Sequence, residues 1–261
     1  MSGAARRSHI VVTGASSGIG AATAERFASR GCAISLVARR EDRLHDVARA
    51  VEQHGGTAEV ITADVGSRAG CERAIAQAQH SFGPVDVLVN NAGMPGGVAF
   101  SLIDVEQIER VMNVNFLSAV WCTKAVLDAM PRGSSIVNVA SIAGKIGIPR
   151  AGAYVASKYA LVGFGEALWF ELRARGIDVI TVNPGPVRTE SFPHRMLRGR
   201  MVLSPDDLAR AIVRAVDRGT PEITVPRYYR IGPILNAVVP PLYRRALRAF
   251  ADRTPDELSP E

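Results

Sequence analysis

The chain has 261 residues, of which 47% are hydrophobic and 21% are charged, and its formal net charge is +6. This length fits one α/β domain with a full core, and this composition excludes a disordered chain. The basic residues are dispersed up to the C-terminal tail and accompany no recognition motif, so we expect no nucleic-acid partner.

Targeting and metal-binding signals are missing from the sequence. No segment approaches the roughly 18 consecutive apolar residues of a membrane span, and the first apolar run, 10–12, is too short for a signal peptide. We therefore expect a cytoplasmic protein. The cysteines and histidines have neither disulfide nor metal-ligand spacing, so we expect buried thiols, surface histidines and no metal site. They are Cys32, Cys71, Cys122, His9, His45, His54, His80 and His194.

Short β-like runs alternate with longer amphipathic stretches, which is typical of a parallel sheet covered by helices. Several runs are apolar almost throughout, which predicts strands buried on both faces. We expect strands over residues 9–13, 33–38, 58–62, 85–90, 134–140, 177–183 and 222–225. We expect helices over residues 18–30, 41–54, 67–82, 104–130, 152–175 and 205–218. Ligands of such sheets bind outside the carboxyl ends of the strands.

A glycine-rich turn follows the first strand and opens the first helix. Its glycines, Gly14, Gly18 and Gly20, allow a tight turn and close approach of the backbone to a pyrophosphate, beside the positive end of the helix dipole. The spacing G-x-x-x-G-x-G differs from the commoner G-x-G-x-x-G, and the Gly-Lys-Ser/Thr ending of a P-loop is missing. The turn predicts a dinucleotide site and argues against an ATPase.

Three side chains further along predict the chemistry. Tyr154 and Lys158 are four residues apart, so on a helix they share one face, and Ser141 precedes them. A phenol has a pKa of about 10 and is a poor proton donor or base near neutral pH. An ammonium about 4–6 Å away contributes roughly 3–4 kcal/mol at an effective dielectric constant near 20. We therefore expect Lys158 to lower the pKa of Tyr154.

These motifs, together with Asn90-Asn91-Ala92-Gly93 and Pro184-Gly185, occur in an order that resembles the short-chain dehydrogenase/reductase family. The resemblance implies a single Rossmann-like, doubly wound α/β domain with about seven parallel strands and helices on both faces. It also implies a nicotinamide cofactor and hydride exchange at a carbon that bears a hydroxyl or carbonyl group. Pairing through the long helices would give a homodimer or homotetramer.

The resemblance also implies catalytic roles for four residues. Tyr154 is the general acid or base, Lys158 tunes it and holds the nicotinamide ribose, and Ser141 hydrogen-bonds the substrate oxygen. Asn115 matches the asparagine that supports a water-linked proton relay, although it would also suit the cap of a backbone kink. Asn113 is a less favoured alternative to it.

Further residues would contact the cofactor. The carboxyl end of the third strand would bind the adenine, the Asn90–Gly93 segment would pass the adenosine ribose, and the Pro184 turn would bind the nicotinamide amide. The predicted contacts are Gly14, Ser16, Ser17, Gly18, Ile19, Gly20, Asp64, Val65, Asn91, Ala92, Gly93, Tyr154, Lys158, Pro184, Gly185, Val187 and Thr189. We expect Asn90 to contact the same region.

The end of the second strand bears on the choice of cofactor. An acidic residue near Ala38 would bind the ribose hydroxyls of NAD and repel a 2′-phosphate, but no acid stands there. Arg39 and Arg40 follow, and guanidinium groups make charge-assisted hydrogen bonds to phosphate. The sequence therefore predicts NADP(H), with Arg39 as the main phosphate ligand and Arg40 stacking or assisting. A solvated basic loop is the alternative.

The substrate side is less specific. We expect a catalytic domain over 1–226, with a substrate-binding loop over 188–204, and a basic and apolar C-terminal extension over 227–261. The loop residues Phe192, Met196, Leu197, Met201 and Val202, with Met94, Pro95 and Val98, favour a lipophilic alcohol or carbonyl compound. The extension would pack on the core, on a second subunit, over the substrate pocket or on an anionic membrane surface, the last as a peripheral contact.

The most specific function that follows is an NADP(H)-dependent oxidoreductase that interconverts a carbonyl and a secondary alcohol. Two alternatives remain open: an NAD(P)-dependent dehydrogenase that oxidises a steroid- or polyol-like alcohol, and a non-catalytic NADPH-binding sensor.

Overall fold

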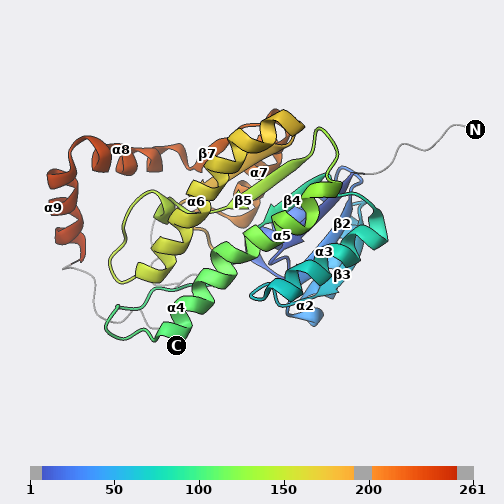
Figure 1. Ribbon diagram of the computed structural model, residues 1–261, viewed down its shortest axis with the longest axis horizontal. Coiled ribbons are helices and arrows are strands. Elements are labelled where there is room, and N and C mark those ends of the chain that lie inside the picture. Colours follow the sequence, from blue (N-terminus) through green and yellow to red (C-terminus); the bar gives the residue numbers. More distant parts are fainter. Residues whose placement is uncertain (1–7, 191–201, 252–261) are drawn as a thin grey trace, which may run out of the picture.

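The sheet has the seven parallel strands that the sequence predicts. The computed structural model describes residues 8–190 and 202–251, and their strands pair in the order β3-β2-β1-β4-β5-β6-β7 (Figure 1). The order reverses between β1 and β4, and doubly wound sheets bind ligands in the crevice at such a reversal. The strands are β1 His9–Thr13, β2 Ala33–Ala38, β3 Thr57–Thr62, β4 Val87–Asn90, β5 Ser135–Val139, β6 Asp178–Pro184 and β7 Glu222–Val225.

Helices cover both faces of the sheet and bury two cores. Alternate side chains of a strand point to opposite faces, so Val11 packs into one core while Ile10 and Val12 pack into the other. All five residues of β1 are buried, which confirms the prediction of strands covered on both faces. One face carries α1 Gly18–Ala28, α2 Glu41–Gln53 and α7 Pro205–Arg218; the other carries α3 Arg68–Phe82, α5 Ser118–Val126 and α6 Gly152–Leu172.

The helix predicted over 104–130 is not continuous. α4 Val105–Met112 passes into a π-helical turn, η1 Asn113–Leu117, before α5 begins, and a short 3-10 turn, η2 Leu127–Ala129, follows α5. A π-helical turn inserts one residue into the helical ladder and is frequent at functional sites. Here the turn carries Asn115, whose side chain is held by the loop after β4. The end of the helix predicted over 152–175 is likewise a 3-10 turn, η4 Arg173–Arg175.

The prediction of surface histidines is wrong for His9, whereas His45, His54 and His80 are exposed. His9 is fully buried in β1, where its ring nitrogens hydrogen-bond the Gly83 carbonyl (3.0 Å) and the Ser35 hydroxyl (2.9 Å). These partners allow an imidazole to replace an apolar side chain in the core. His194 lies outside the described residues. The three cysteines are buried as predicted, and the described residues hold no cluster suited to a metal ion.

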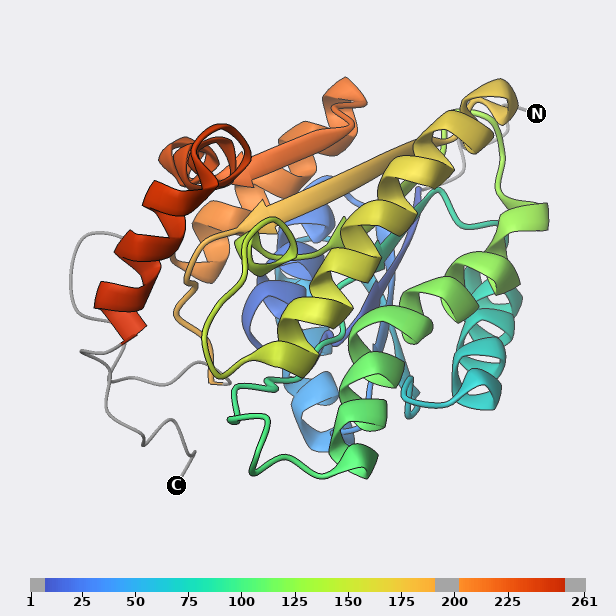
Figure 2. The same cartoon turned by 60° about the vertical axis from the view of Figure 1, so that its left-hand side comes forward.

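Residues 227–251 form a C-terminal arm at one side of the sheet. After β7 the chain forms a 3-10 turn, η6 Arg227–Arg230, and two helices, α8 Ile231–Val238 and α9 Pro240–Ala251. Figure 1 shows α8 and α9 reaching outward beyond β7 and α6, and Figure 2 shows the same arm from another side. The apolar side chains of α8 are exposed in the single chain, while the predicted packing partner of the extension stays a prediction. Among the described residues, no helix has the length and apolar content to cross a membrane.

Two glycines of α6 differ sharply in their surroundings. A Cβ atom on Gly165 would lie 2.3 Å from the Thr181 hydroxyl on β6, whereas one on Gly163 would meet nothing within 4 Å. We expect Gly165→Ala to lower the free energy of unfolding by about 1–3 kcal/mol, because the helix must move off the sheet. Gly163→Ala is the matched control and should raise it by about 0.5–1 kcal/mol, because alanine favours a helix. Urea denaturation measures both; equal effects of the two variants would contradict this close packing.

Candidate active site

The turns after β1 and β4 are tied together at the reversal of the strand order. The Thr13 hydroxyl donates to the Val89 carbonyl (3.3 Å) and accepts from the backbone N–H groups of Asn91 and Ala92 (both 3.0 Å). The Asn91 amide donates to the Thr13 carbonyl (2.9 Å). A Cβ atom on Gly14, whose φ is +65°, would lie 2.9 Å from the Ala92 Cα. Asn91 and Ala92 therefore shape the predicted dinucleotide site by holding the glycine turn in place.

The first turn of α1 offers donors to an anion. Ser17 precedes the helix with an extended backbone, and its side chain makes no capping hydrogen bond to the helix. The first N–H groups of a helix lack intrahelical partners, and together with the helix dipole they favour a phosphate group. A Cβ atom on Gly20 would lie 2.3 Å from the Gly14 carbonyl oxygen, so only glycine permits the closed turn. Both features fit the pyrophosphate of a dinucleotide.

Ser141, Tyr154 and Lys158 come together at the carboxyl end of β5. Ser141 begins a short 3-10 turn, η3 Ile142–Gly144, and hydrogen-bonds Tyr154, which lies in the first turn of α6. The Lys158 Nζ lies 5.8 Å from the centre of the Tyr154 ring and donates to the Val139 carbonyl (3.0 Å). The structure thus brings the predicted trio together on one side of α6.

The proton affinities in this trio differ from the sequence-based prediction. Burial raises the pKa of Tyr154, and the hydrogen bond with Ser141 lowers it by less. Burial also lowers the pKa of Lys158 to about 8. The predicted lowering of the tyrosine pKa by Lys158 is therefore wrong for the protein by itself, because desolvation penalises the charged forms of both groups. The site instead holds a protonated phenol beside a mostly protonated amine at neutral pH.

Asn115 braces the loop after β4 against α6. Its side-chain oxygen accepts from the Met94 N–H (2.7 Å), and its amide donates to the Met94 carbonyl and the Ser157 hydroxyl (both 3.1 Å). Ser157 donates in turn to the Tyr154 carbonyl (2.7 Å). These contacts favour the structural alternative, in which Asn115 holds the kinked helix. Its predicted part in a proton relay stays a prediction.

A basic cluster follows β2. Arg39 and Arg40 are both exposed, and Arg40 donates to the Ser16 and Ser17 hydroxyls (3.1 and 2.8 Å). The same guanidinium forms an ion pair with Glu190 (2.9 Å), beyond the end of β6. Arg40 therefore bridges the glycine turn and the start of the predicted substrate loop. Sequence inspection missed Glu190, because nothing local connects it to a side chain 150 positions away.

The cofactor contacts predicted after β3 and at the end of β4 differ in where the structure places their side chains. Asp64 and Val65 follow β3, where the Asp64 carboxylate accepts from the Gly66 N–H (2.9 Å) and Val65 is buried. Asn90 does not reach the site: it is buried, and its amide donates to Asn138 (2.9 Å) and Thr123 (3.2 Å). Its expected contact with the cofactor region is wrong, because its side chain points into the core.

The turn after β6 lies between the glycine turn and the C-terminal arm. Thr189 approaches Gly18, where a Cβ atom would lie 3.0 Å from the threonine methyl group. Gly185 donates to the Val225 carbonyl (2.8 Å) and lies under the Tyr229 ring, which is 2.3 Å from where its Cβ would be. Tyr229 is a second residue that sequence inspection missed. Pro184 and Val187 are buried beside this turn.

The ends of the predicted substrate loop are held together, because Arg188 and Leu203 are joined by a backbone hydrogen bond (2.9 Å). The predicted apolar contacts Phe192, Met196, Leu197 and Met201 lie outside the described residues. Val202 is half-buried, as are Met94 and Val98, whereas Pro95 is exposed.

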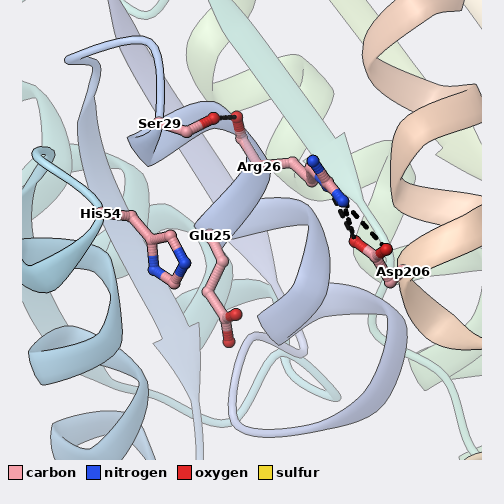
Figure 3. A pocket seen from close by; sticks show the side chains of 5 residues that line it. All are labelled: Glu25, Arg26, Ser29, His54 and Asp206. Carbon is pink, nitrogen blue, oxygen red and sulfur yellow. Dashed lines mark hydrogen bonds and ion pairs between the residues drawn. The ribbon is translucent and has the colours of Figure 1, made fainter.

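A hollow between α1, α2 and α7 holds none of the motif residues. Figure 3 shows it lined by Glu25, Arg26, Ser29, His54 and Asp206. The Arg26 guanidinium makes two hydrogen bonds to the Asp206 carboxylate (2.8 and 2.9 Å). This pair joins α1 to α7, and we assign the hollow a structural role.

The chain belongs to the short-chain dehydrogenase/reductase family. The family model described as short chain dehydrogenase matches residues 8–196. A 3-ketodihydrosphingosine reductase of Bos taurus is 36% identical over 228 residues, which cover 81% of this chain and 69% of the relative. A putative ketoacyl reductase of Streptomyces coelicolor is 42% identical over 183 residues, covering 69% and 70%.

A solved structure supports the same assignment. A blue fluorescent protein from a metagenomic library, in complex with NADPH, matches with a TM-score of 0.79 at 30% identity, over 84% of this chain and 96% of that one. The protein is therefore an oxidoreductase that acts on carbonyl or alcohol groups.

The buried ammonium of Lys158 makes a prediction for stability. Because its pKa is lowered from 10.5 to about 8, the folded protein binds fewer protons than the unfolded chain between these pH values. The penalty for burying the charge is present below pH 8 and is relieved as the pH rises. Relative to Lys158→Met, the free energy of unfolding of the parent should therefore rise by about 2 kcal/mol from pH 7 to pH 10.

Urea denaturation at both pH values measures this difference. Lys124→Met, a change at an exposed lysine of α5, is the matched control for the loss of one amine. Parallel pH profiles of the parent and Lys158→Met would contradict a lowered lysine pKa.

Proposed function

We propose that the protein is an NADPH-dependent reductase that converts a ketone of a lipophilic substrate into a secondary alcohol. The observation that carries the proposal is the half-buried Tyr154, whose phenol is hydrogen-bonded to Ser141 and whose ring centre lies 5.8 Å from the Lys158 Nζ. The phenol carries its proton at neutral pH, as a donor for carbonyl reduction must, and the charge of Lys158 would offset the raised pKa as the phenolate forms. Alcohol oxidation by the same group would require the phenolate, which a raised pKa makes scarce at neutral pH.

NADPH, when bound, supplies the hydride that reaches the carbonyl carbon. Ser141 orients the substrate oxygen by hydrogen bonding, and Tyr154 gives its proton to that oxygen as the C=O double bond becomes a C–O single bond. The positive charge of Lys158 favours the phenolate that Tyr154 then becomes, and the low local dielectric strengthens this effect. Solvent returns the proton to Tyr154 after release of the alcohol.

The preference for NADPH rests on the residues after β2. Arg39 and Arg40 place two guanidinium groups at the carboxyl edge, and Ala38 stands where an acid would select NAD. A structural relative is described in complex with NADPH, and the glycine turn leads into a helix N-terminus, which favours the pyrophosphate of such a cofactor.

The lipophilic substrate is supported by exposed apolar side chains in the segment that follows β4. Met94, whose backbone is held by Asn115, begins a segment that exposes Phe100 (84%) and Leu102 (77%). Two relatives are named as reductases of keto compounds, a ketodihydrosphingosine and a ketoacyl substrate. We therefore place a ketone with a long apolar chain ahead of a small polar ketone.

Replacing the proton donor should remove turnover while preserving cofactor binding. We expect Tyr154→Phe to lower kcat by about 10²- to 10⁴-fold, because the phenol gives the proton in the transition state. NADPH absorbance, followed over a panel of ketones of increasing chain length, measures turnover, and quenching of protein fluorescence by NADPH measures binding. Turnover that survives the change would contradict the role of Tyr154. Absence of turnover by the parent on every ketone of the panel would contradict the proposed reductase.

Glu190 and the arginines should have opposite effects on cofactor preference. Arg39→Asp should reverse the preference from NADPH to NADH, because a carboxylate repels the 2′-phosphate and accepts from ribose hydroxyls. Glu190→Gln should tighten NADPH binding by about two- to fivefold, because Arg40 loses its competing carboxylate. Binding of NADH should change little.

Titration of each variant with both cofactors measures these shifts. Arg73→Gln, a change at an exposed arginine of α3, serves as the control for loss of a positive charge. An unchanged preference in Arg39→Asp would contradict the assignment of Arg39 to the phosphate.

A further inference from the structure

The C-terminal arm presents an apolar stripe that nothing in the described chain covers. Ile231, Ile234, Leu235 and Val238 follow the spacing i, i+3, i+4 and i+7, so they lie on one face of α8. Their side chains are between 44% and 72% exposed, and Leu242 at the start of α9 is 64% exposed. The substantial contacts of α8 are with η6 and α9, its neighbours along the chain.

The charge of the arm is of one sign. Residues 227–251 contain five arginines and no aspartate or glutamate. Two of the arginines precede the apolar stripe and three follow it, and all five are exposed: Arg227, Arg230, Arg244, Arg245 and Arg248. An exposed apolar helix face flanked by cations is the pattern of a segment that lies in the interface of a bilayer with anionic lipids.

We propose that the C-terminal arm binds the surface of an anionic lipid bilayer. The apolar stripe of α8 enters the boundary between headgroups and acyl chains, and the arginines contact the anionic headgroups. A second copy of the chain fits the arm less well. Pairing of the arm with the arm of a second copy would bring ten arginines together without an acidic residue of the arm to offset them.

The arm is attached beside the active site. At its base, the Tyr229 ring covers Gly185 in the turn after β6. In α9, Tyr243 lies near enough to Tyr159 of α6 for the two phenols to influence each other electrostatically, and Tyr159 follows Lys158 directly. Figure 2 shows α8 and α9 at the side of the sheet where β6 and β7 end. Binding through the arm would thus hold the active-site edge close to the lipid. The benefit of this placement for the reaction rests on the proposed lipophilic substrate, whereas membrane binding itself does not.

Sedimentation of the full-length chain with vesicles tests the proposal. We expect the protein to bind vesicles of phosphatidylcholine with phosphatidylglycerol and to bind those of phosphatidylcholine alone far more weakly. Raising the salt from about 0.1 M to 1 M, which shortens the Debye length from about 10 Å to 3 Å, should weaken binding. Arg244→Gln with Arg245→Gln should lower the partition coefficient at least about tenfold, since each arginine near an anionic surface contributes about fivefold.

The apolar stripe is tested separately. Ile234→Ser with Val238→Ser should abolish binding and leave the turnover of soluble ketones unchanged, because neither residue belongs to the catalytic or cofactor site. Phe170→Ser in α6, a change at a side chain that is 67% exposed outside the arm, is the matched control and should still bind.

Three outcomes would overturn the proposal. The first is failure of the parent to bind either kind of vesicle, and the second is equal binding of the parent and both arm variants. The third is a dimer, measured by analytical ultracentrifugation without lipid, that dissociates in Ile234→Ser with Val238→Ser; this would assign the stripe to a second copy. Because vesicle binding is measured without substrate, its failure is distinguishable from failure of the proposed reductase.

Discussion

The active-site edge is organised around one buried cation, the ammonium of Lys158. It is 4% exposed and donates to the Val139 carbonyl at the end of β5. Burial of an ammonium is costly, which is why its pKa falls to about 8. Gly144 packs closely on the backbone of the same residue: a Cβ atom there would lie 2.6 Å from the Lys158 carbonyl oxygen, whereas one on Gly93 would lie 3.8 Å from the Nζ, an ordinary contact distance. The turn after β5 therefore requires a glycine where it packs on α6 at Lys158.

Burial also affects the proton donor of the proposed reduction. Desolvation raises the pKa of the half-buried Tyr154 phenol, so this group carries its proton at neutral pH but is a weaker acid than a free phenol. The nearby ammonium has most effect once the phenol has lost its proton, because opposite charges then face each other in a low-dielectric site. Stabilisation that grows as charge develops lowers the barrier, whereas equal stabilisation of both states would not.

The C-terminal arm follows a different physical rule from the rest of the chain. The strands and the helices that cover the sheet bury their apolar side chains in two cores, whereas α8 leaves its apolar face in water. Contiguous exposed apolar surface is unfavourable in a monomer and marks sites of interaction. The concentration of arginine in the same segment, without any acid, favours an anionic lipid surface as the partner.

Local sequence patterns determined the strands, most of the helices and the order of the motifs. β2, β7 and α7 occupy the predicted residues, since clear stop and start signals, such as Ser204-Pro205, bound them. Tertiary structure alone decided the π-helical turn at Asn115, the burial of His9, the raised pKa of Tyr154 and the pairing of Arg40 with Glu190. All of these depend on groups that are not neighbours in the sequence, and the burial of His9 and the raised pKa of Tyr154 depend also on exclusion of water; a local pattern of residues encodes neither.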